Sequence, residues 1–524
     1  MAASAVHAAA EGVRSNDGAP LAGCDHVVVF PFMAKGHMIP LLHFATALAA
    51  HHGDELRVTL VTTPANLAFA RRRLPPSSVR VVTIPFPAHP DLPAGVESTS
   101  ALPSPSLFPA FLRATALLRE PFAAFLASLP SPPLVLVSDF FLGFTQRVAD
   151  DAGVRRLTFN GMSAFSLALC FTLATRRPFV GVEDGAELHV PGFPEDVRIT
   201  ADEVPDAVVE GENLDDPVTQ FLVDEVRDWE HRSWGVLVNS FAALDSDYAA
   251  ILETFYLPSS RAWLVGPLFL AASESPETKQ QDDDDDDEEG CLRWLDERAG
   301  RPGSVVYVPF GTQVHLPAAQ LDELAHGLVD SGHAFLWAVG RPGAGEWSPP
   351  VDAGRYGKIV RGWVPQRRVL SHPAVGAFVT HAGWNSVLES PAAGRPMLAW
   401  PVMAEQAANA KHVADIIGAG IRMDRRRCPN TGAAVVVGRA QVADKVRRLM
   451  DGAEEGRTIR AKAKEIRQVA LSAVAENGTS RVALRQLVDE LRSSYIDGYG
   501  DGDGERSAAN SKTVSPASDA NYER

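Results

Sequence analysis

The sequence predicts an α/β protein with two doubly wound domains of similar size, each built on a parallel sheet. Short β-branched runs alternate with segments of helical spacing in both halves of the chain, as in consecutive βαβ units. A polar, acidic stretch without periodicity, Ala271 to Gly290, separates the two halves. The length of 524 residues suffices for two such domains.

The first half alternates strands with helices. Apolar, β-rich runs predict strands at His26–Phe32, Leu56–Thr62, Val79–Ile84, Leu134–Ser138, Gly235–Asn239 and Ala262–Val265. Helical spacing is found at Ile39–Ala50, Ala65–Arg73 and Leu107–Leu129, and a short loop, Met33–His37, joins the first strand to the first helix.

The second half repeats this alternation. Strands are predicted at Ser304–Pro309, Ala334–Val339, Lys358–Arg361, Ala374–Thr380 and Met397–Ala399. Helices are predicted at Ala318–Ser331, from Asn385 onward, and at Gln406–Ile417, Arg439–Met450, Arg457–Glu476 and Thr479–Ser493.

These patterns divide the chain into two domains with flanking segments. The predicted boundaries are 1–24 (disordered N-terminus), 25–265 (first α/β domain), 266–290 (acidic linker), 291–478 (second α/β domain), 479–495 (C-terminal helix) and 496–524 (disordered tail). Ligands of doubly wound folds bind outside the carboxyl ends of the strands, which predicts a site between the domains.

Composition excludes several classes of protein. The net charge is −16, and half of it comes from the run Asp282–Glu289, so a basic nucleic-acid-binding face is not expected. The four cysteines form no CxxC pair, which argues against a zinc site or a disulfide framework. The longest apolar run, Phe165–Ala174, is too short to span a bilayer, and Met1–Gly23 lacks the apolar core of a signal peptide. We therefore expect a monomeric cytoplasmic protein without a transmembrane segment.

The segment from Trp363 to Gln406 is dense in polar and aromatic residues. Gly383 lies where a predicted strand ends and a helix begins, so backbone N–H groups and the helix dipole can bind a diphosphate there. Three residues that flank this turn can donate hydrogen bonds: His381, Asn385 and Ser386. Glu389 lies one helical turn after Asn385, where its carboxylate can accept from ribose hydroxyls.

Other residues of this segment suit a base and a sugar. Trp363 offers a flat face for a base, Gln366 an amide for a nucleoside, and Glu405 with Gln406 opens a helix suited to sugar hydroxyls. Each has a simpler interpretation when taken alone. Trp363 can belong to the core, His381 can end a strand, and Glu389 can face solvent. Glu405 can be a helix N-terminal charge that the dipole favours.

Taken together, these residues resemble the signature box of the plant secondary-product glycosyltransferases, family 1 of the UDP-glycosyltransferases. The interval from Trp363 to Gln406 has the 44-residue length of that box. Further resemblance lies in SVVYVPFGT at Ser304–Thr312, WLVGP at Trp263–Pro267, and Gly36-His37 with Pro40. The chain departs from the family at Ala382, where Cys is usual, and at Pro309, where Ser is common. Pro391, inside a predicted helix, is expected to kink or shorten it.

The resemblance implies a GT-B fold, with an acceptor-binding N-terminal domain and a UDP-sugar-binding C-terminal domain. It implies that Trp363 stacks on uracil, that Val364 and Gln366 hold the nucleoside, and that Glu389 binds the ribose. It assigns the diphosphate to Thr312, His381, Asn385 and Ser386, and the sugar to Trp384, Glu405 and Gln406. A final Gln is usual in glucose users, so UDP-glucose is the expected donor substrate. The family is metal-independent and inverting, and no cofactor is expected.

Two residues of the first half form a candidate catalytic pair. Transfer to a hydroxyl needs a base, and His37 follows the first strand, where a cleft residue belongs. Asp139 ends the strand Leu134–Ser138 and can orient and stabilise a protonated imidazole. From the residues alone, His37 can equally cap a helix and Asp139 can be the N-cap of a helix near Leu142. The resemblance implies that His37 is the base and Asp139 its partner.

Other functions also fit parts of this sequence pattern. A nucleotide-dependent oxidoreductase would need a GxGxxG loop after the first strand, but Met33–His37 holds a single glycine. A non-catalytic sugar-nucleotide binding protein would keep the box without the pair. Another UDP-sugar, such as UDP-galactose or UDP-xylose, is the main competitor as donor. The acceptor is expected to be a small apolar or aromatic molecule such as a flavonoid or other phenolic, since Phe86–Phe108 and Gly161–Val197 are rich in Pro, Phe and Leu. A hormone or terpenoid is the alternative.

Overall fold

The computed structural model describes residues 25–500 apart from several internal segments, which are 76–77, 184, 201–202, 206–207, 209–214, 273–286, 288–289, 311–315, 340–346, 355, 362–363 and 425–434. The predicted N-terminus 1–24 and most of the acidic linker lie outside the described residues. The predicted disordered tail, 496–524, is wrong for 496–500, which are helical, and its remainder lies outside the described residues.

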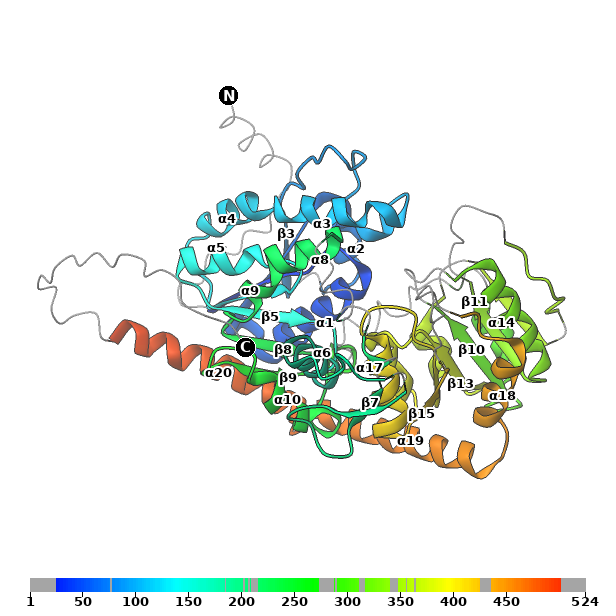
Figure 1. The fold of residues 1–524 in the computed structure, drawn as a ribbon. Coiled ribbons are helices and arrows are strands. Elements are labelled where there is room, and N and C mark those ends of the chain that lie inside the picture. Colours follow the sequence, from blue (N-terminus) through cyan, green and yellow to red (C-terminus); the bar gives the residue numbers. More distant parts are fainter. Residues whose placement is uncertain are drawn as a thin grey trace, which may run out of the picture.

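The N-terminal domain is built on a seven-stranded sheet in the order β3-β2-β1-β4-β5-β8-β9 (Figure 1). Its strands are β1 (Asp25–Phe30), β2 (Leu56–Thr62), β3 (Val79–Thr83), β4 (Val135–Asp139), β5 (Arg156–Asn160), β8 (Gly235–Val238) and β9 (Arg261–Leu264). All neighbours are parallel, with Val27 opposite Val58 and Val28 opposite Leu136. A small antiparallel pair, β6 (Glu187–His189) and β7 (Arg198–Thr200), lies apart from this sheet.

The C-terminal domain has a six-stranded parallel sheet in the order β12-β11-β10-β13-β14-β15. Its strands are β10 (Val305–Pro309), β11 (Ala334–Ala338), β12 (Gly357–Val360), β13 (Val375–Thr380), β14 (Met397–Ala399) and β15 (Gly420–Arg422).

Helices cover both sheets. Those of the first half are α1 (Lys35–His52), α2 (Leu67–Arg71), α3 (Phe108–Ala116), α4 (Arg119–Ala127), α5 (Phe144–Ala152), α6 (Ala164–Arg176), α8 (Pro217–Phe221), α9 (Asp228–Glu230), α10 (Ala242–Glu253) and α11 (Leu268–Ala272). Those of the second half are α13 (Cys291–Asp296), α14 (Ala318–Asp330), α15 (Gln366–Ser371), α16 (Trp384–Ala392), α17 (Gln406–Lys411), α18 (Arg439–Met450), α19 (Glu454–Val474) and α20 (Thr479–Gly500). Two π-helical segments, Leu222–Arg227 and His412–Ile417, extend α8 and α17.

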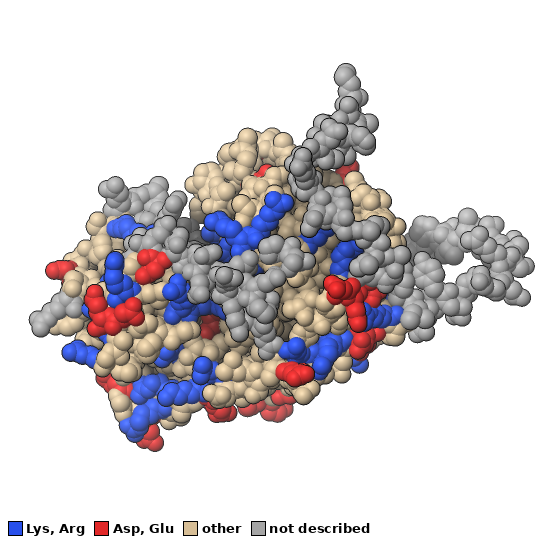
Figure 2. Space-filling model, turned by 180° about the vertical axis from the view of Figure 1, so that it is seen from behind, with Lys and Arg blue, Asp and Glu red and all other residues tan. Residues whose placement is uncertain are grey.

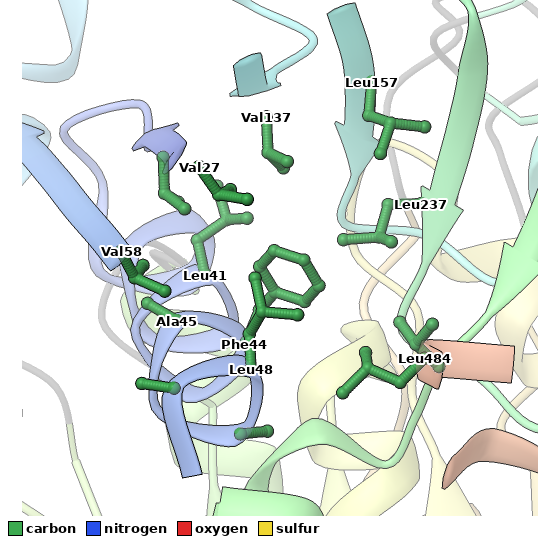
Figure 3. Packing of buried hydrophobic residues seen from close by; sticks show 14 of the residues in the cluster. Val27, Leu41, Phe44, Ala45, Leu48, Val58, Val137, Leu157, Leu237 and Leu484 are labelled. Carbon is green, nitrogen blue, oxygen red and sulfur yellow. The ribbon is translucent and has the colours of Figure 1, made fainter. Parts of the chain in front are cut away.

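The last described helix, α20, packs against the N-terminal domain. In Figure 3, Leu41, Phe44 and Leu48 of α1 pack between the strands of the N-terminal sheet and Leu484 of α20. Two further side chains of α20, Leu487 and Leu491, are buried in the same cluster. Figure 1 accordingly shows α20, in red, returning beneath the N-terminal sheet after α19 has covered the C-terminal domain. Burial of this apolar face therefore ties the C-terminal helix to the first domain.

The structure corrects several predicted boundaries. Helix α1 begins at Lys35 instead of Ile39, so His37 lies in its first turn and not in a loop. Helix α20 continues to Gly500, five residues beyond the predicted end. Helix α16 ends at Ala392, directly after Pro391, which shortens it as expected.

Four strands were not predicted: the antiparallel pair β6 and β7, and strands β5 and β15 of the parallel sheets. Strand β5 alternates polar with apolar residues, yet it is buried on both faces because helices cover both sides of a doubly wound sheet. Strand β15 has only three residues, too few to show a period.

The strand orders place both candidate sites at points where the winding of the sheet reverses. In the first sheet this point lies between β1 and β4, directly before His37 and at Asp139. In the second sheet it lies between β10 and β13, directly before His381. Doubly wound sheets bind ligands at such points.

Candidate active site

The structure brings His37 and Asp139 into contact. His37 Nδ1 lies 2.8 Å from Asp139 Oδ2, although 102 positions separate the two residues in the sequence. The Asp139 side chain is fully buried, whereas 24% of the His37 side chain is exposed. Because an ionised carboxylate only accepts hydrogen bonds, the proton of a neutral imidazole sits on Nδ1. The second ring nitrogen, Nε2, is thereby left as a base.

Asp139 is held by its own surroundings. Its Oδ1 accepts a hydrogen bond from the Phe141 backbone N–H at 3.1 Å. Asp139 does not cap the following helix, since the N-cap residue of α5 is Gly143. Behind it lies Arg156, a fully buried residue that donates to Asp139 O at 3.3 Å and to Ser138 Oγ at 2.8 Å. Burial lowers the pKa of Arg156 to about 10, which leaves it cationic at neutral pH. Sequence reasoning missed Arg156 because it belongs to the unpredicted strand β5.

The environment of His37 makes it a stronger base. Burial alone would lower the pKa of His37, but the charge of Asp139, its hydrogen bond and the charge of Glu405 together raise that pKa above its ordinary value. Glu405 belongs to the other domain. The basicity of His37 therefore depends on both domains.

Aromatic rings surround the imidazole. The ring centroids of Phe32, Phe140 and Phe141 lie 5.5, 6.0 and 5.5 Å from that of His37. Phe111 extends this set by packing on Phe32 at 5.8 Å, and Phe86 stacks on Phe111 at 5.8 Å. Phe32 and Phe111 are fully buried, whereas Phe86, Phe140 and Phe141 are partly exposed, so these three rings are the ones that a planar apolar molecule near the imidazole could contact.

The turn between β13 and α16 has the geometry of an anion site. The first backbone bond of the helix runs from Val387 N to Gly383 O, so the three preceding amides, from Trp384 to Ser386, have no partner within the helix. Ala382 adopts a left-handed conformation with φ of 64°. A Cβ on Gly383 would lie 2.5 Å from His381 Nε2, so the turn needs glycine at this position.

His381 is neutral at this turn. Burial lowers its pKa to about 4. Its Nδ1 is buried and has no hydrogen-bond partner among the described residues. A neutral imidazole can donate a hydrogen bond to a phosphate oxygen without adding a charge.

Gln366 and Glu389, which are predicted to bind the nucleoside and its ribose, lie together with Ser386, which is predicted to bind the diphosphate. Gln366 Nε2 donates to Glu389 Oε2 and, at 3.3 Å, to Ser386 Oγ. Burial raises the pKa of Glu389, while the bond from Gln366 and the charge of Arg367 oppose the shift. Val364 is buried in the neighbouring apolar cluster. Trp363 and Thr312 lie outside the described residues.

Trp384 lies in the contact between the domains. Its indole is buried, and Nε1 donates to Asn239 O of the N-terminal domain at 2.7 Å. This leaves its backbone amide, at the start of α16, to face a ligand. Asn385 also crosses between the domains, since its Nδ2 donates to Gly36 O at 2.8 Å.

Glu405 and Gln406 follow a second left-handed alanine, Ala404, with φ of 53°. Gln406 Oε1 accepts from the backbone N–H groups of Val402 and Met403 at 2.9 and 3.1 Å, so its oxygen is committed to the loop. Glu405 Oε1 accepts from Asn409 Nδ2 at 3.2 Å. Asn409 is a further residue that the sequence did not indicate, because no local pattern shows what a buried amide contacts.

Other features of the described residues bear on the class of protein. They contain no group of three or more His, Cys, Asp or Glu side chains arranged to hold a metal ion. No helix within the described ranges combines the length and apolarity that crossing a bilayer requires. Cys170 and Cys291 are buried free thiols. Figure 2 shows Lys and Arg mixed with Asp and Glu across one face of the molecule.

Two doubly wound domains, each on a parallel sheet, fit the GT-B fold of glycosyltransferases. Sequence models of two families match the chain: "UDP-glucoronosyl and UDP-glucosyl transferase" over residues 285–437 and "Glycosyltransferase, N-terminal domain" over residues 26–189.

Individual relatives cover nearly the whole chain. A flavonol 3-O-glucosyltransferase of Arabidopsis thaliana is 38% identical over 87% of this chain and 93% of its own length. A scopoletin glucosyltransferase of Nicotiana tabacum is 34% identical over 90% and 99%. A solved UGT of Glycyrrhiza uralensis, complexed with glycyrrhetinic acid 3-O-monoglucuronide, has a TM-score of 0.80 and 31% identity over 91% of this chain and 97% of its own. The protein belongs to the plant UDP-glycosyltransferase family, and it is an enzyme of the transferase class that uses a UDP-sugar and a small acceptor.

Proposed function

We propose that this enzyme transfers glucose from UDP-glucose, with inversion, to a hydroxyl of a small aromatic acceptor. The observation that carries the proposal is the His37–Asp139 pair, which sits at the reversal point of one sheet while the β13–α16 turn occupies that of the other. A base and an anion site from different domains are what a transfer between two bound substrates requires.

In the proposed reaction, His37 Nε2 accepts the proton of the acceptor hydroxyl. The hydroxyl oxygen forms a bond to the anomeric carbon while the bond from that carbon to the UDP oxygen breaks. A single displacement from the face opposite UDP inverts the anomeric centre. General-base assistance of this kind contributes about 10²–10⁴-fold to the rate.

Asp139 acts on the histidine and not on the substrate. It keeps the proton on Nδ1 and stabilises the imidazolium that forms when Nε2 takes the acceptor proton. On the other side of the reacting centre, the amides at the start of α16 stabilise the charge that develops on the leaving diphosphate.

The predicted residues of the C-terminal domain are assigned to the parts of UDP-glucose. We infer that Trp363, Val364 and Gln366 hold the uridine and that Glu389 accepts from the ribose hydroxyls. Thr312, His381, Asn385 and Ser386 would bind the diphosphate, and Trp384, Glu405 and Gln406 the glucose. Since Gln366 bonds Glu389 and Ser386 directly, a ribose has to compete with these contacts. Since Trp384 directs its indole toward Asn239, a contact of Trp384 with the donor would come from its backbone amide at the start of α16.

The acceptor class is supported by the rings around His37 and by the relatives. Their names include a flavonol, an anthocyanin and scopoletin, all of which carry hydroxyls on aromatic rings. We propose a flavonoid or related phenolic for this enzyme. We also infer that the protein is a cytoplasmic monomer divided at the predicted domain boundaries, and that it needs no metal. Activity that persists unchanged in EDTA would agree with the last point.

The test is the His37→Ala variant assayed with UDP-glucose and a panel of phenolics. Product formation is followed by mass spectrometry, and the anomeric configuration is read by NMR. We expect a loss of about 10²–10⁴-fold in kcat with UDP binding retained. Undiminished transfer by the variant would show that His37 is not the base. Equal rates with UDP-galactose or UDP-xylose would overturn the donor assignment, and an α-linked product would overturn inversion.

A further inference from the structure

Asn409 of α17 is a fully buried amide that joins three segments of the molecule. Its Nδ2 donates to Ala382 O at 2.9 Å and to Glu405 Oε1 at 3.2 Å. Its Oδ1 accepts from Ser166 Oγ at 2.7 Å. Both amide hydrogens therefore meet acceptors and the oxygen meets a donor, so only one orientation of the side chain satisfies all three contacts.

The first contact acts on the β13–α16 turn. Ala382 is in the left-handed region with φ of 64°, which costs a non-glycine residue free energy unless its surroundings hold it there. Asn409 holds the carbonyl of this residue. The following amides, which open α16, are the groups assigned to the diphosphate, so their direction depends on how Ala382 is fixed.

The second contact acts on Glu405, which also follows a left-handed alanine, Ala404 with φ of 53°. Burial raises the pKa of Glu405, while the hydrogen bond from Asn409 and the charge of His37 favour its ionised form. Asn409 thus supports the carboxylate assigned to the sugar and sets its position relative to the diphosphate turn.

The third contact comes from the other domain. Ser166 lies in the first turn of α6 and is fully buried. The start of α6 is itself fixed, because Asp245 accepts from the backbone amides of Ala164 and Phe165 at 3.1 and 3.2 Å. The Phe165 ring stacks on His412 at 4.5 Å, and His412 lies parallel to Trp384 at 6.0 Å. The start of α6 in the acceptor domain therefore contacts Asn409 directly and is linked to Trp384, the first residue of α16, through the ring of His412.

We propose that Asn409 is a positioning residue for the donor site, and that the Ser166 hydroxyl of the acceptor domain sets how tightly the donor binds. The inference rests on the proposed function, since it takes the β13–α16 turn and Glu405 as the donor's diphosphate and sugar contacts. Polar groups that are buried and fully satisfied fix a unique arrangement, whereas an apolar side chain at position 409 would leave Ala382 O without a partner.

The first experiment measures UDP binding by calorimetry in the native protein and in Asn409→Ala. Removing the amide frees the carbonyl of Ala382, so we expect the Kd for UDP to rise about tenfold. We also expect the ratio of kcat/KM for UDP-glucose over UDP-galactose to fall, because Glu405 loses the hydrogen bond from Asn409 that positions its carboxylate. A residue that only stabilises the fold would lower Tm without changing either quantity in the folded fraction.

The matched control is Gln320→Ala. Gln320 is a buried amide of the same domain that makes two bonds to the backbone of Val437, at 2.8 and 3.0 Å. We expect this variant to lose stability while its UDP affinity stays native.

The second experiment uses Ser166→Ala, a milder change that removes a single hydroxyl from the acceptor domain. We expect the Kd for UDP to rise about threefold to fivefold with the acceptor KM unchanged. Its control is Ser480→Ala, which removes another buried hydroxyl that bonds a distant segment, at Gly266 O.

The outcomes separate the two proposals. Native UDP affinity in both Asn409→Ala and Ser166→Ala, with binding and transfer intact in the parent enzyme, would overturn this inference alone. Failure of the parent enzyme to bind UDP would overturn the proposed function and this inference with it. If Asn409→Ala does not fold, the Ser166→Ala result decides.

Discussion

Replacing Asp139 by Asn tests the His37–Asp139 pair with little change in side-chain shape. Asp139 accepts two hydrogen bonds, from His37 Nδ1 at 2.8 Å and from Phe141 N at 3.1 Å. An amide has only one oxygen, so in either orientation its NH₂ group points at one of these nitrogens. If the NH₂ group faces His37, Nδ1 has to become an acceptor. The ring proton then moves to Nε2, the atom that has to accept the acceptor's proton.

The expected fall in kcat follows from two changes in the Asp139→Asn variant. The variant loses a charge-assisted hydrogen bond to the imidazolium, worth about 1.5–3 kcal/mol, and it favours the wrong tautomer of His37. Together these amount to about 3–5 kcal/mol of transition-state stabilisation, a fall of roughly 10²–10⁴-fold in kcat. UDP binding should not change, because the side-chain hydrogen bonds of Asp139 go to His37 and Phe141 of its own domain and not to the donor turn.

The dependence of kcat/KM on pH is a second, independent test of the role of Asp139. In the native enzyme the pKa of His37 is raised, and kcat/KM should fall as the pH drops through a value above 6.5, where His37 becomes protonated. In the variant, burial still lowers this pKa while the charge and hydrogen bond of Asp139 are gone. The acidic limb should therefore move to lower pH even as the plateau falls.

Asp150→Asn is the matched control, because Asp150 is a carboxylate of the same domain that pairs with Arg232 at 2.8 Å on the surface. It should leave both the plateau and the limb unchanged. If Asp139→Asn keeps more than about a third of native kcat, or if its acidic limb does not move, the orienting role assigned to Asp139 is wrong. The double variant with His37→Ala should be no slower than His37→Ala alone, since the two residues act as a unit.

Three further predictions concern UDP binding and the stability of the fold. Gly383→Ala should raise the Kd for UDP and cost about 1–3 kcal/mol of stability, because its Cβ would meet His381 Nε2 at 2.5 Å; native values for both in calorimetry and urea unfolding would contradict this. Arg156→Met should destabilise the fold by about 3–5 kcal/mol because it leaves Ser138 Oγ, Ser233 Oγ and Asp139 O without their buried donor and removes a positive charge that favours ionised Glu230. Adding Glu230→Gln should restore part of the loss, and a double variant less stable than the single one would refute the charge coupling. The third prediction is that acid destabilises the protein between pH 6.5 and about 4, measured as a falling urea midpoint. In that range several histidines bind protons in the unfolded chain but not in the folded protein. The contribution of these histidines to stability is therefore present above pH 6.5 and is lost as the pH falls. A constant urea midpoint would exclude this prediction. The histidines concerned have their pKa lowered to about 4 or about 3 by burial and are His26, His51 and His381 (about 4) and His43 (about 3).

Much of the fold could be predicted because its signals are local. Runs of apolar residues set the strands of both sheets, and the predicted ranges of β2, β14 and α18 agree with the structure residue for residue. Strand β5 was missed because its burial on both faces comes from helices elsewhere in the chain. The start of helix α1 was predicted four residues too late, because Gly36 argues locally against a helix. Pro40 lies inside the helix and cannot bond Gly36 O, which accepts a hydrogen bond from Asn385 Nδ2 of the other domain instead.

The sequence by itself determined the family, the two-domain α/β architecture and the residues from which the site is built, because these depend on residue type and spacing. Only the tertiary structure decided how those residues meet. It paired His37 with Asp139, turned the indole of Trp384 into the contact between the domains, and placed Arg156 and Asn409 behind the site. Hydrogen bonds between residues on different strands, on different helices or in different domains depend on sheet order and domain docking. Such contacts leave no periodic trace in the chain.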